Sequence, residues 1–140
     1  MTTMTSRGEF LSTGMKGGIA LVAGGAVLGM AAGPALGQAT GDVAIAKLAA
    51  TAELLAIDFY GKAIGTGLFK ADELAYLNAA KMNEQDHYDA LAKVLGSKAV
   101  KSPAFDFGGA TGSQKAFTAA AIAIEDLGVS AYAGQGPRLK

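Results

Sequence analysis

The 140-residue sequence contains no cysteine, which excludes disulfide bonds, thiolate metal sites and cysteine nucleophiles. Tryptophan is also absent, and there is a single histidine. The 12 basic and 12 acidic residues balance, so the chain offers no positive field that would attract nucleic acid. The sequence also has no dinucleotide-binding fingerprint and no phosphate-cradling glycine loop. We therefore expect neither a nucleic-acid partner nor a bound nucleotide cofactor.

Alanine and glycine are the residues that the sequence has in abundance. The length predicts a single domain. Alanine-rich stretches with few β-branched residues favour α-helices, and the glycines fall mostly in the N-terminal segment and between the expected helices. The composition therefore predicts an all-α fold.

An uncharged, apolar stretch occupies residues 17–37, after a polar segment that carries Arg7 and Lys16. Small residues end the stretch, and charged sequence follows it. A basic start, an apolar middle and a small-residue end are typical of an export signal. We therefore divide the chain into an export signal or membrane anchor at residues 1–39 and a helical domain at residues 40–140.

Two interpretations of the N-terminal segment stay open. Cleavage after Gly37 or Ala39 would release an exported, periplasmic domain. The apolar residues 17–37 are also numerous enough, at about 20, to form a helix that anchors the chain in a membrane, with the domain on the periplasmic side. Residues 6–11 resemble the twin-arginine signal S-R-R-x-F-L, except that Gly8 stands where the second arginine belongs.

Three helices are predicted after residue 40. The first runs from Asp42 to about Ile64, the second from Ala71 to Leu95 and the third from Gln114 to about Tyr132. Ser113 is a good N-cap for the third helix, because its hydroxyl can accept a bond from a free amide of the first turn. Gly96 follows the second helix, as glycine commonly does at a helix C-terminus.

Each predicted helix has one face of small or apolar residues that also carries an acidic residue. In the first helix this face consists of Ala46, Ala49, Glu53, Ala56 and Tyr60. In the second it consists of Leu77, Ala80, Glu84, His87, Leu91 and Val94. In the third it consists of Thr118, Ala121, Glu125, Gly128 and Tyr132. Steps of three and four residues place each set on one side of its helix, which we expect to face inward.

Three acids and the only histidine therefore fall on inward-facing sides of helices. Buried carboxylates repel one another and are costly unless they are neutralised. A bound cation would remove both penalties. Glu84 and His87 lie three residues apart, so their side chains point the same way and can bind one ion. Carboxylate oxygens with one imidazole favour iron(II), manganese or zinc over copper(I).

The segment from Glu125 to Tyr132 reads E-D-L-G-V-S-A-Y. Together with Glu53 and the Glu84-x-x-His87 pair, it resembles the exported ferritin-like domain family, whose members include desiccation-related proteins. In that family four helices supply a Glu, a Glu-x-x-His, a Glu within an E-D-x-G-V-x-A-Y segment, and a second Glu-x-x-His. The resemblance implies that Glu53, Glu84, His87 and Glu125 bind one or two ions of iron or manganese. It also implies iron(II) oxidation or reduction of oxygen or peroxide as the chemistry of such a site.

The resemblance further implies a ferritin-like bundle, here with about three helices after an N-terminal apolar helix. The sequence offers no fourth helix and no second Glu-x-x-His. We therefore expect a homo-oligomer, or a partner protein that completes the bundle. Whether the site is catalytic stays open. The alternative is a metal-free helical structural or interaction protein, held at a membrane by residues 17–37.

Aromatic residues complete the sequence-based expectations. Phe105 and Phe107 alternate in the connection before the third helix and are expected to pack onto the bundle. Tyr60, Tyr88 and Tyr132 are interpreted as core or rim aromatics rather than redox residues.

Overall fold

The computed structural model describes residues 20–23, 26–30 and 41–139. Three long helices dominate it: α2 (Asp42–Gly65), α3 (Ala71–Leu95) and α4 (Gln114–Gln135). The bounds of the three predicted helices are confirmed to within a few residues, as is the helical bundle that they imply.

Local signals explain where the helices begin and end. The Ser113 hydroxyl accepts a 3.1 Å bond from the amide of Ala116 and so caps α4, as predicted. Asp42 lies in the first turn of α2, where a negative charge interacts favourably with the helix dipole. Gly96 ends α3 with a φ of 55°, a conformation that glycine adopts without steric penalty.

Short elements accompany the helices. Three 3₁₀ turns are η1 (Gly96–Lys98), η2 (Gly108–Thr111) and η3 (Gly136–Arg138). The strands β1 (Ala20–Ala23), β2 (Ala26–Met30) and β3 (Phe105–Asp106) form an antiparallel sheet in the order β1-β2-β3. In the register of this sheet Ala23 pairs with Ala26, and Met30 pairs with Phe105.

The prediction of an apolar N-terminal helix is wrong for the residues described, because residues 20–23 and 26–30 form strands. The sequence contains a reason, since the glycines that dilute this stretch are poor helix formers. The pair Gly24-Gly25 is also typical of two-residue hairpin connections. No helix within the described residues is long and apolar enough to cross a membrane. The twin-arginine-like segment and the proposed cleavage sites lie outside the described residues.

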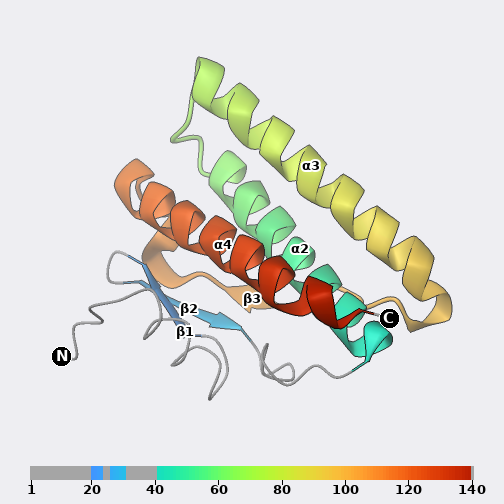
Figure 1. Ribbon diagram of the computed structural model, residues 1–140. Helices are drawn as coiled ribbons and strands as arrows, with labels where there is room; N and C mark the ends of the chain where they lie inside the picture. Colours follow the sequence, from blue (N-terminus) through green and yellow to red (C-terminus); the bar gives the residue numbers. More distant parts are fainter. Residues whose placement is uncertain (1–19, 24–25, 31–40, 140) are drawn as a thin grey trace.

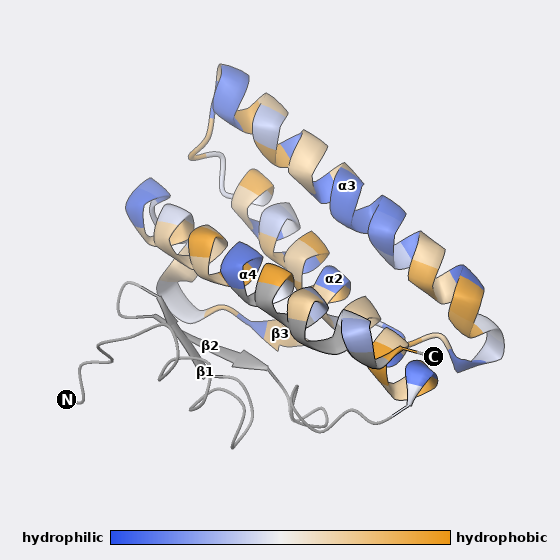
Figure 2. Ribbon diagram, viewed as in Figure 1, coloured by the Kyte–Doolittle hydropathy of each residue, from blue (hydrophilic) through white to orange (hydrophobic). Residues whose placement is uncertain are grey.

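The helix α2 lies between α3 and α4 and packs most extensively against α3 (Figure 1). The other two helices lie on either side of it and make few contacts with each other. Figure 2 shows that α3 is hydrophilic over much of its surface, and only Leu77 and Leu95 of this helix are buried. A groove therefore runs between α3 and α4, with α2 contributing to its floor.

An aromatic cluster forms the core at one end of this groove. The ring of Phe59 stacks on that of Phe117 at 4.8 Å and meets that of Phe107 edge-on at 5.2 Å. Phe105 and Phe107 are both buried, which confirms that the connection packs onto the bundle. Lys62 holds it there, because its Nζ donates to the carbonyl of Phe105 at 2.9 Å and lies 4.6 Å from the centre of the Phe107 ring.

Parts of the predicted inward faces are open to solvent. On α3, Leu77 is buried, but the His87 side chain is 60% exposed and Val94 is 80% exposed. Among the α4 side chains whose burial the structure describes, the buried ones are Phe117, Ala120 and Ile124, so the predicted face containing Glu125 borders the groove instead. The reason is that α3 and α4 make few contacts with each other, because a helix side that meets no neighbour keeps its apolar residues in water.

Candidate metal centre

Three of the four predicted ligands meet between α2 and α3. Glu53 comes from α2, and Glu84 and His87 come from adjacent turns of α3. One ligand atom of each residue lies within 4.8 Å of the other two. The Nδ1 atom of His87 is 3.4 Å from Oε2 of Glu84 and 3.7 Å from Oε2 of Glu53.

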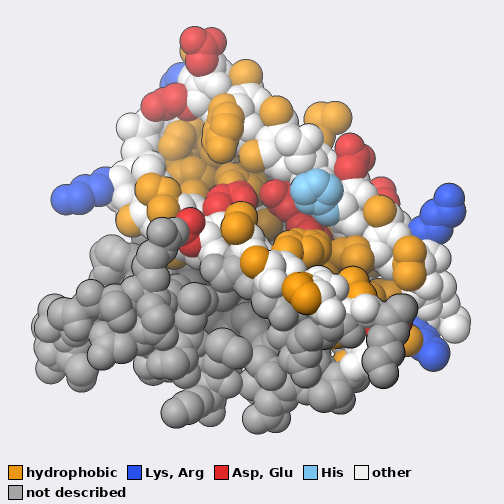
Figure 3. Space-filling view, in the orientation of Figure 1, with side chains coloured by type: hydrophobic (Ala, Val, Ile, Leu, Met, Phe, Trp, Pro, Cys, Tyr) orange, Lys and Arg blue, Asp and Glu red, His pale blue; other side chains and the backbone are white. Residues whose placement is uncertain are grey.

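The three residues differ in their access to water. Glu53 is the one buried charged residue among those described, at 4% exposure, because α2 is the central helix. Glu84 is half-buried and His87 lies at the rim. Figure 3 shows the histidine beside acidic side chains in a hollow bordered by hydrophobic ones. The site is thus closed on the α2 side and open on the groove side.

Electrostatics favour a proton or a cation at this cluster. Burial, hydrogen bonding to Glu53 and the negative charges of Glu53 and Glu125 together raise the pKa of Glu84 to about 8. Among the described residues, no lysine or arginine forms an ion pair with Glu53 or Glu84. The carboxylates therefore lack the basic partners that commonly neutralise buried acids.

Glu125, the fourth predicted ligand, lies near this cluster but outside the group of three. Its Oε1 atom accepts a 2.5 Å hydrogen bond from the hydroxyl of Tyr60. Its charge nevertheless reaches the cluster, since it contributes to the raised pKa of Glu84. The structure thus brings Glu53, Glu84 and His87 together and holds Glu125 at the neighbouring edge of the groove.

Two tyrosines form hydrogen bonds with carboxylates of the site, a role that was not predicted from the sequence, although Tyr60 is a buried core aromatic as expected. Tyr60 donates to Glu125, and Tyr132 donates a short hydrogen bond to Oε1 of Glu53. Burial and these hydrogen bonds raise the pKa of both phenols, so each remains a protonated donor. The seven-residue spacing of Glu125 and Tyr132, which puts both on one side of α4, was the available signal.

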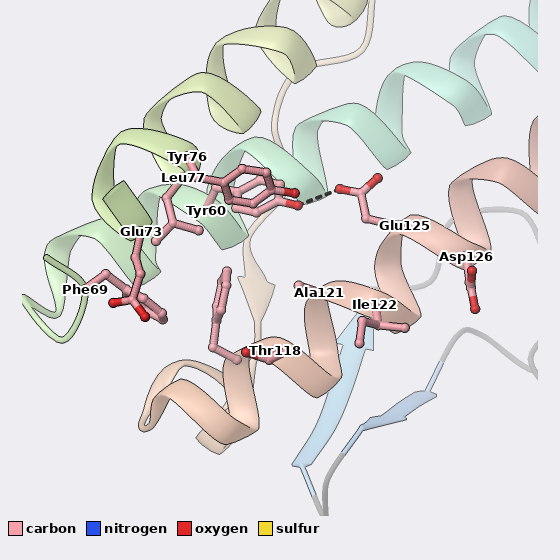
Figure 4. A pocket seen from close by; sticks show the side chains of 11 residues that line it. Tyr60, Phe69, Glu73, Tyr76, Leu77, Thr118, Ala121, Ile122, Glu125 and Asp126 are labelled. Atoms are coloured by element: carbon pink, nitrogen blue, oxygen red, sulfur yellow. Dashed lines mark hydrogen bonds between the residues drawn. The ribbon is translucent and has the colours of Figure 1, made fainter. Parts of the chain in front are cut away.

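A cavity of about 590 Å³ lies between α3 and α4, and Glu125 is part of its lining. Figure 4 shows Tyr60 and Glu125 at its wall, joined by their hydrogen bond. The cavity is lined mainly by apolar and aromatic side chains, which include Phe69, Leu77, Phe117 and Ile122.

The donor set fits a first-row divalent ion. Such ions hold carboxylate oxygen and imidazole nitrogen at about 2.0–2.2 Å, so two ligands of one ion lie no more than about 4.4 Å apart. Both distances from His87 fall within that span. Its exposed side chain also has room to adjust. Two carboxylates with one imidazole, free of lysine or arginine partners in the part of the chain described, are therefore compatible with metal binding.

Comparisons with known proteins agree with the geometry. The sequence model of the ferritin-like domain family matches residues 41–140, which include all three helices and all four predicted ligands. No curated protein and no solved structure is matched. Because the family match covers most of the chain, the protein belongs to the ferritin-like domain family.

Proposed function

We propose that this protein binds iron or manganese through Glu53, Glu84 and His87, with Glu125 as an additional ligand. The observation that carries the proposal is the convergence of three donor atoms within 4.8 Å on a half-buried, acid-rich site. The chemistry that bound iron would supply is oxidation of iron(II), coupled to reduction of oxygen or peroxide.

The residues of the chain have distinct roles in this proposal. Glu53 supplies a carboxylate from the closed side, while Glu84 and His87 supply the two ligands of one helix. Glu84 is the residue that must give up a proton, because its pKa of about 8 keeps it largely protonated at neutral pH. Glu125 lies beside the cavity, where it could join the ion from the open side.

The proposal predicts that Glu84→Ala combined with His87→Ala removes metal binding. After growth with iron and manganese, elemental analysis of the purified full chain should find about one or two ions per wild-type chain. The double variant should retain only background metal. Added manganese should raise the melting temperature of the wild type by several degrees and that of the double variant not at all, because an ion that binds only the folded state stabilises it.

A matched control is Asp86→Ala combined with Asp89→Ala, which removes two exposed carboxylates from the same helix. This control should bind metal as the wild type does. Absence of metal from the wild type would contradict the proposal. It would favour instead a metal-free interaction protein, for which the exposed apolar residues beside the groove are the supporting observation.

We also propose that a second copy of this chain covers the groove. We define the open face as the exposed apolar residues Tyr76 and Val94 of α3 and Ile122 and Val129 of α4. Tyr76 and Ile122 line the cavity that also contains Glu125, and exposed apolar patches of this kind mark association surfaces. The formal charge of the chain is zero, so two copies do not repel. A symmetric pair would supply further ligands from the second copy.

Light scattering after size-exclusion chromatography should therefore find a dimer for the wild type. Ile122→Lys should give a monomer, because a charge on the open face would have to be desolvated. Met82→Lys is the control and should leave the dimer intact. Met82 is as exposed as Tyr76 but points about 120° away from it around α3, so it lies off the open face. A wild-type monomer would refute the pairing.

Export to the periplasm completes the proposal. Its support is the sequence pattern of residues 1–39, with a basic start and an apolar middle. The intact mass of the protein recovered from its native compartment tests for cleavage near Gly37 or Ala39.

A further inference from the structure

We infer that Tyr132 is a positioning residue that holds the Glu53 carboxylate so that one defined oxygen faces His87. The inference rests on the proposed metal site and goes beyond it, because it assigns a role to a residue that is not itself a ligand.

The two oxygens of Glu53 have different partners. Oε1 accepts the hydrogen bond from the Tyr132 hydroxyl, and Oε2 is the atom that lies 3.7 Å from Nδ1 of His87. Because Glu53 is buried, water does not compete freely for either oxygen. The hydrogen bond therefore fixes which oxygen is turned toward the group of three.

The hydrogen bond also links α2 to α4. Glu53 lies on α2 and Tyr132 lies near the end of α4, 79 residues later in the chain. Phenol-to-carboxylate bonds are charge-assisted and stronger than neutral ones. A partner of this kind orients a metal-binding carboxylate, and its loss typically costs about 10–100-fold in metal affinity.

One oxygen bound to tyrosine leaves one oxygen for an ion. Glu53 would then bind through Oε2 alone, and the coordination number of the ion would stay lower than with a chelating carboxylate. Removal of the hydroxyl in Tyr132→Phe would free Oε1 to approach the same ion. The expected signature is a change in coordination, which a merely structural tyrosine would not produce.

Cobalt(II) is a suitable probe, because its visible bands are intense in four- or five-coordinate sites and weak in six-coordinate ones. Titration of the full-length wild type should give intense bands. Tyr132→Phe should weaken these bands and lower the cobalt affinity about tenfold. The control is Tyr88→Phe, which removes a 2.7 Å bond from a tyrosine hydroxyl to the carbonyl of Val100, and it should change neither quantity.

Each outcome is decisive. A Tyr132→Phe variant with wild-type bands and affinity would overturn the role of Tyr132 while leaving the metal site intact. A lower melting temperature of the metal-free variant with unchanged bands would show a structural role only, and would also overturn the inference. Failure of the wild type to bind cobalt would overturn both the inference and the proposed function.

Discussion

Replacing Phe59 by alanine is expected to lower the free energy of unfolding by about 3–5 kcal/mol. Phe59 is fully buried, and its ring contacts those of Tyr60, Phe107 and Phe117. These contacts join α2 to α4 and to the connection between α3 and α4. The substitution would leave a cavity that rigid neighbouring rings cannot close. Urea denaturation followed by circular dichroism measures the loss.

Small domains have only about 5–15 kcal/mol of stability in total, so this variant could fail to fold. Phe59→Leu provides a milder test and should cost less, because leucine fills part of the volume. The control is Met82→Ala, which shortens a side chain that is 67% exposed and points away from the open face, and it should change stability by no more than about 0.5 kcal/mol. Equal losses for Phe59→Ala and Met82→Ala would contradict the core described above.

The second large effect is a loss of stability of the metal-free protein as the pH rises. The pKa of Glu84 is raised from 4.5 to about 8 in the folded state. Between these values the folded chain keeps a proton that the unfolded chain has lost, so the free energy of unfolding falls. The stability that the proton on Glu84 contributes is fully present below about pH 4.5, and it is lost as the pH rises through about 8.

Urea denaturation at pH 5.5 and pH 8.5 with a chelator present measures this loss. We expect the wild type to lose roughly 1–2 kcal/mol more than Glu84→Gln over this interval, less than the difference in pKa alone would give, because water reaches the site and screens the charges. The amide of glutamine does not ionise, which removes the pH dependence of this position. Parallel losses in the two proteins would show that Glu84 is not the group that carries the proton.

The proton on Glu84 should also make metal binding depend on pH. An ion must displace it from Glu84, so affinity should rise with pH up to about 8. The apo stability and the metal affinity therefore respond to pH in opposite directions, since repulsion among the carboxylates destabilises the empty site and favours the cation.

The sequence by itself determined the features that depend on near neighbours. Ser113 and Gly96 end helices through contacts within a few residues, so α3 and α4 could be bounded without knowledge of the fold. The Glu84-x-x-His87 pair shares a side of α3 because helical geometry alone places residues i and i+3 together. These local rules were sufficient for the three helices and for half of the candidate site.

Only the tertiary structure decided which carboxylate meets which partner. Tyr132 donates to Glu53, whereas Tyr60 donates to Glu125, and either pairing was compatible with the sequence. Helical periodicity shows that residues share a face, but it does not show what that face meets. The pairing of β2 with β3 is equally long-range, which is why the N-terminal apolar stretch was predicted as a helix.

The exposure of the α3 face that carries His87 and Val94 also depends on contacts between helices, which helical periodicity does not show. Periodicity grouped Val94 and His87 with buried Leu77, yet both are open to solvent because α3 packs on α2 and makes few contacts with α4. The direction in which one helix packs on another depends on the packing summed over the whole contact, to which the stacked rings of Phe59 and Phe117 contribute between α2 and α4. Burial is a property of that packing, so a sequence pattern alone does not specify it.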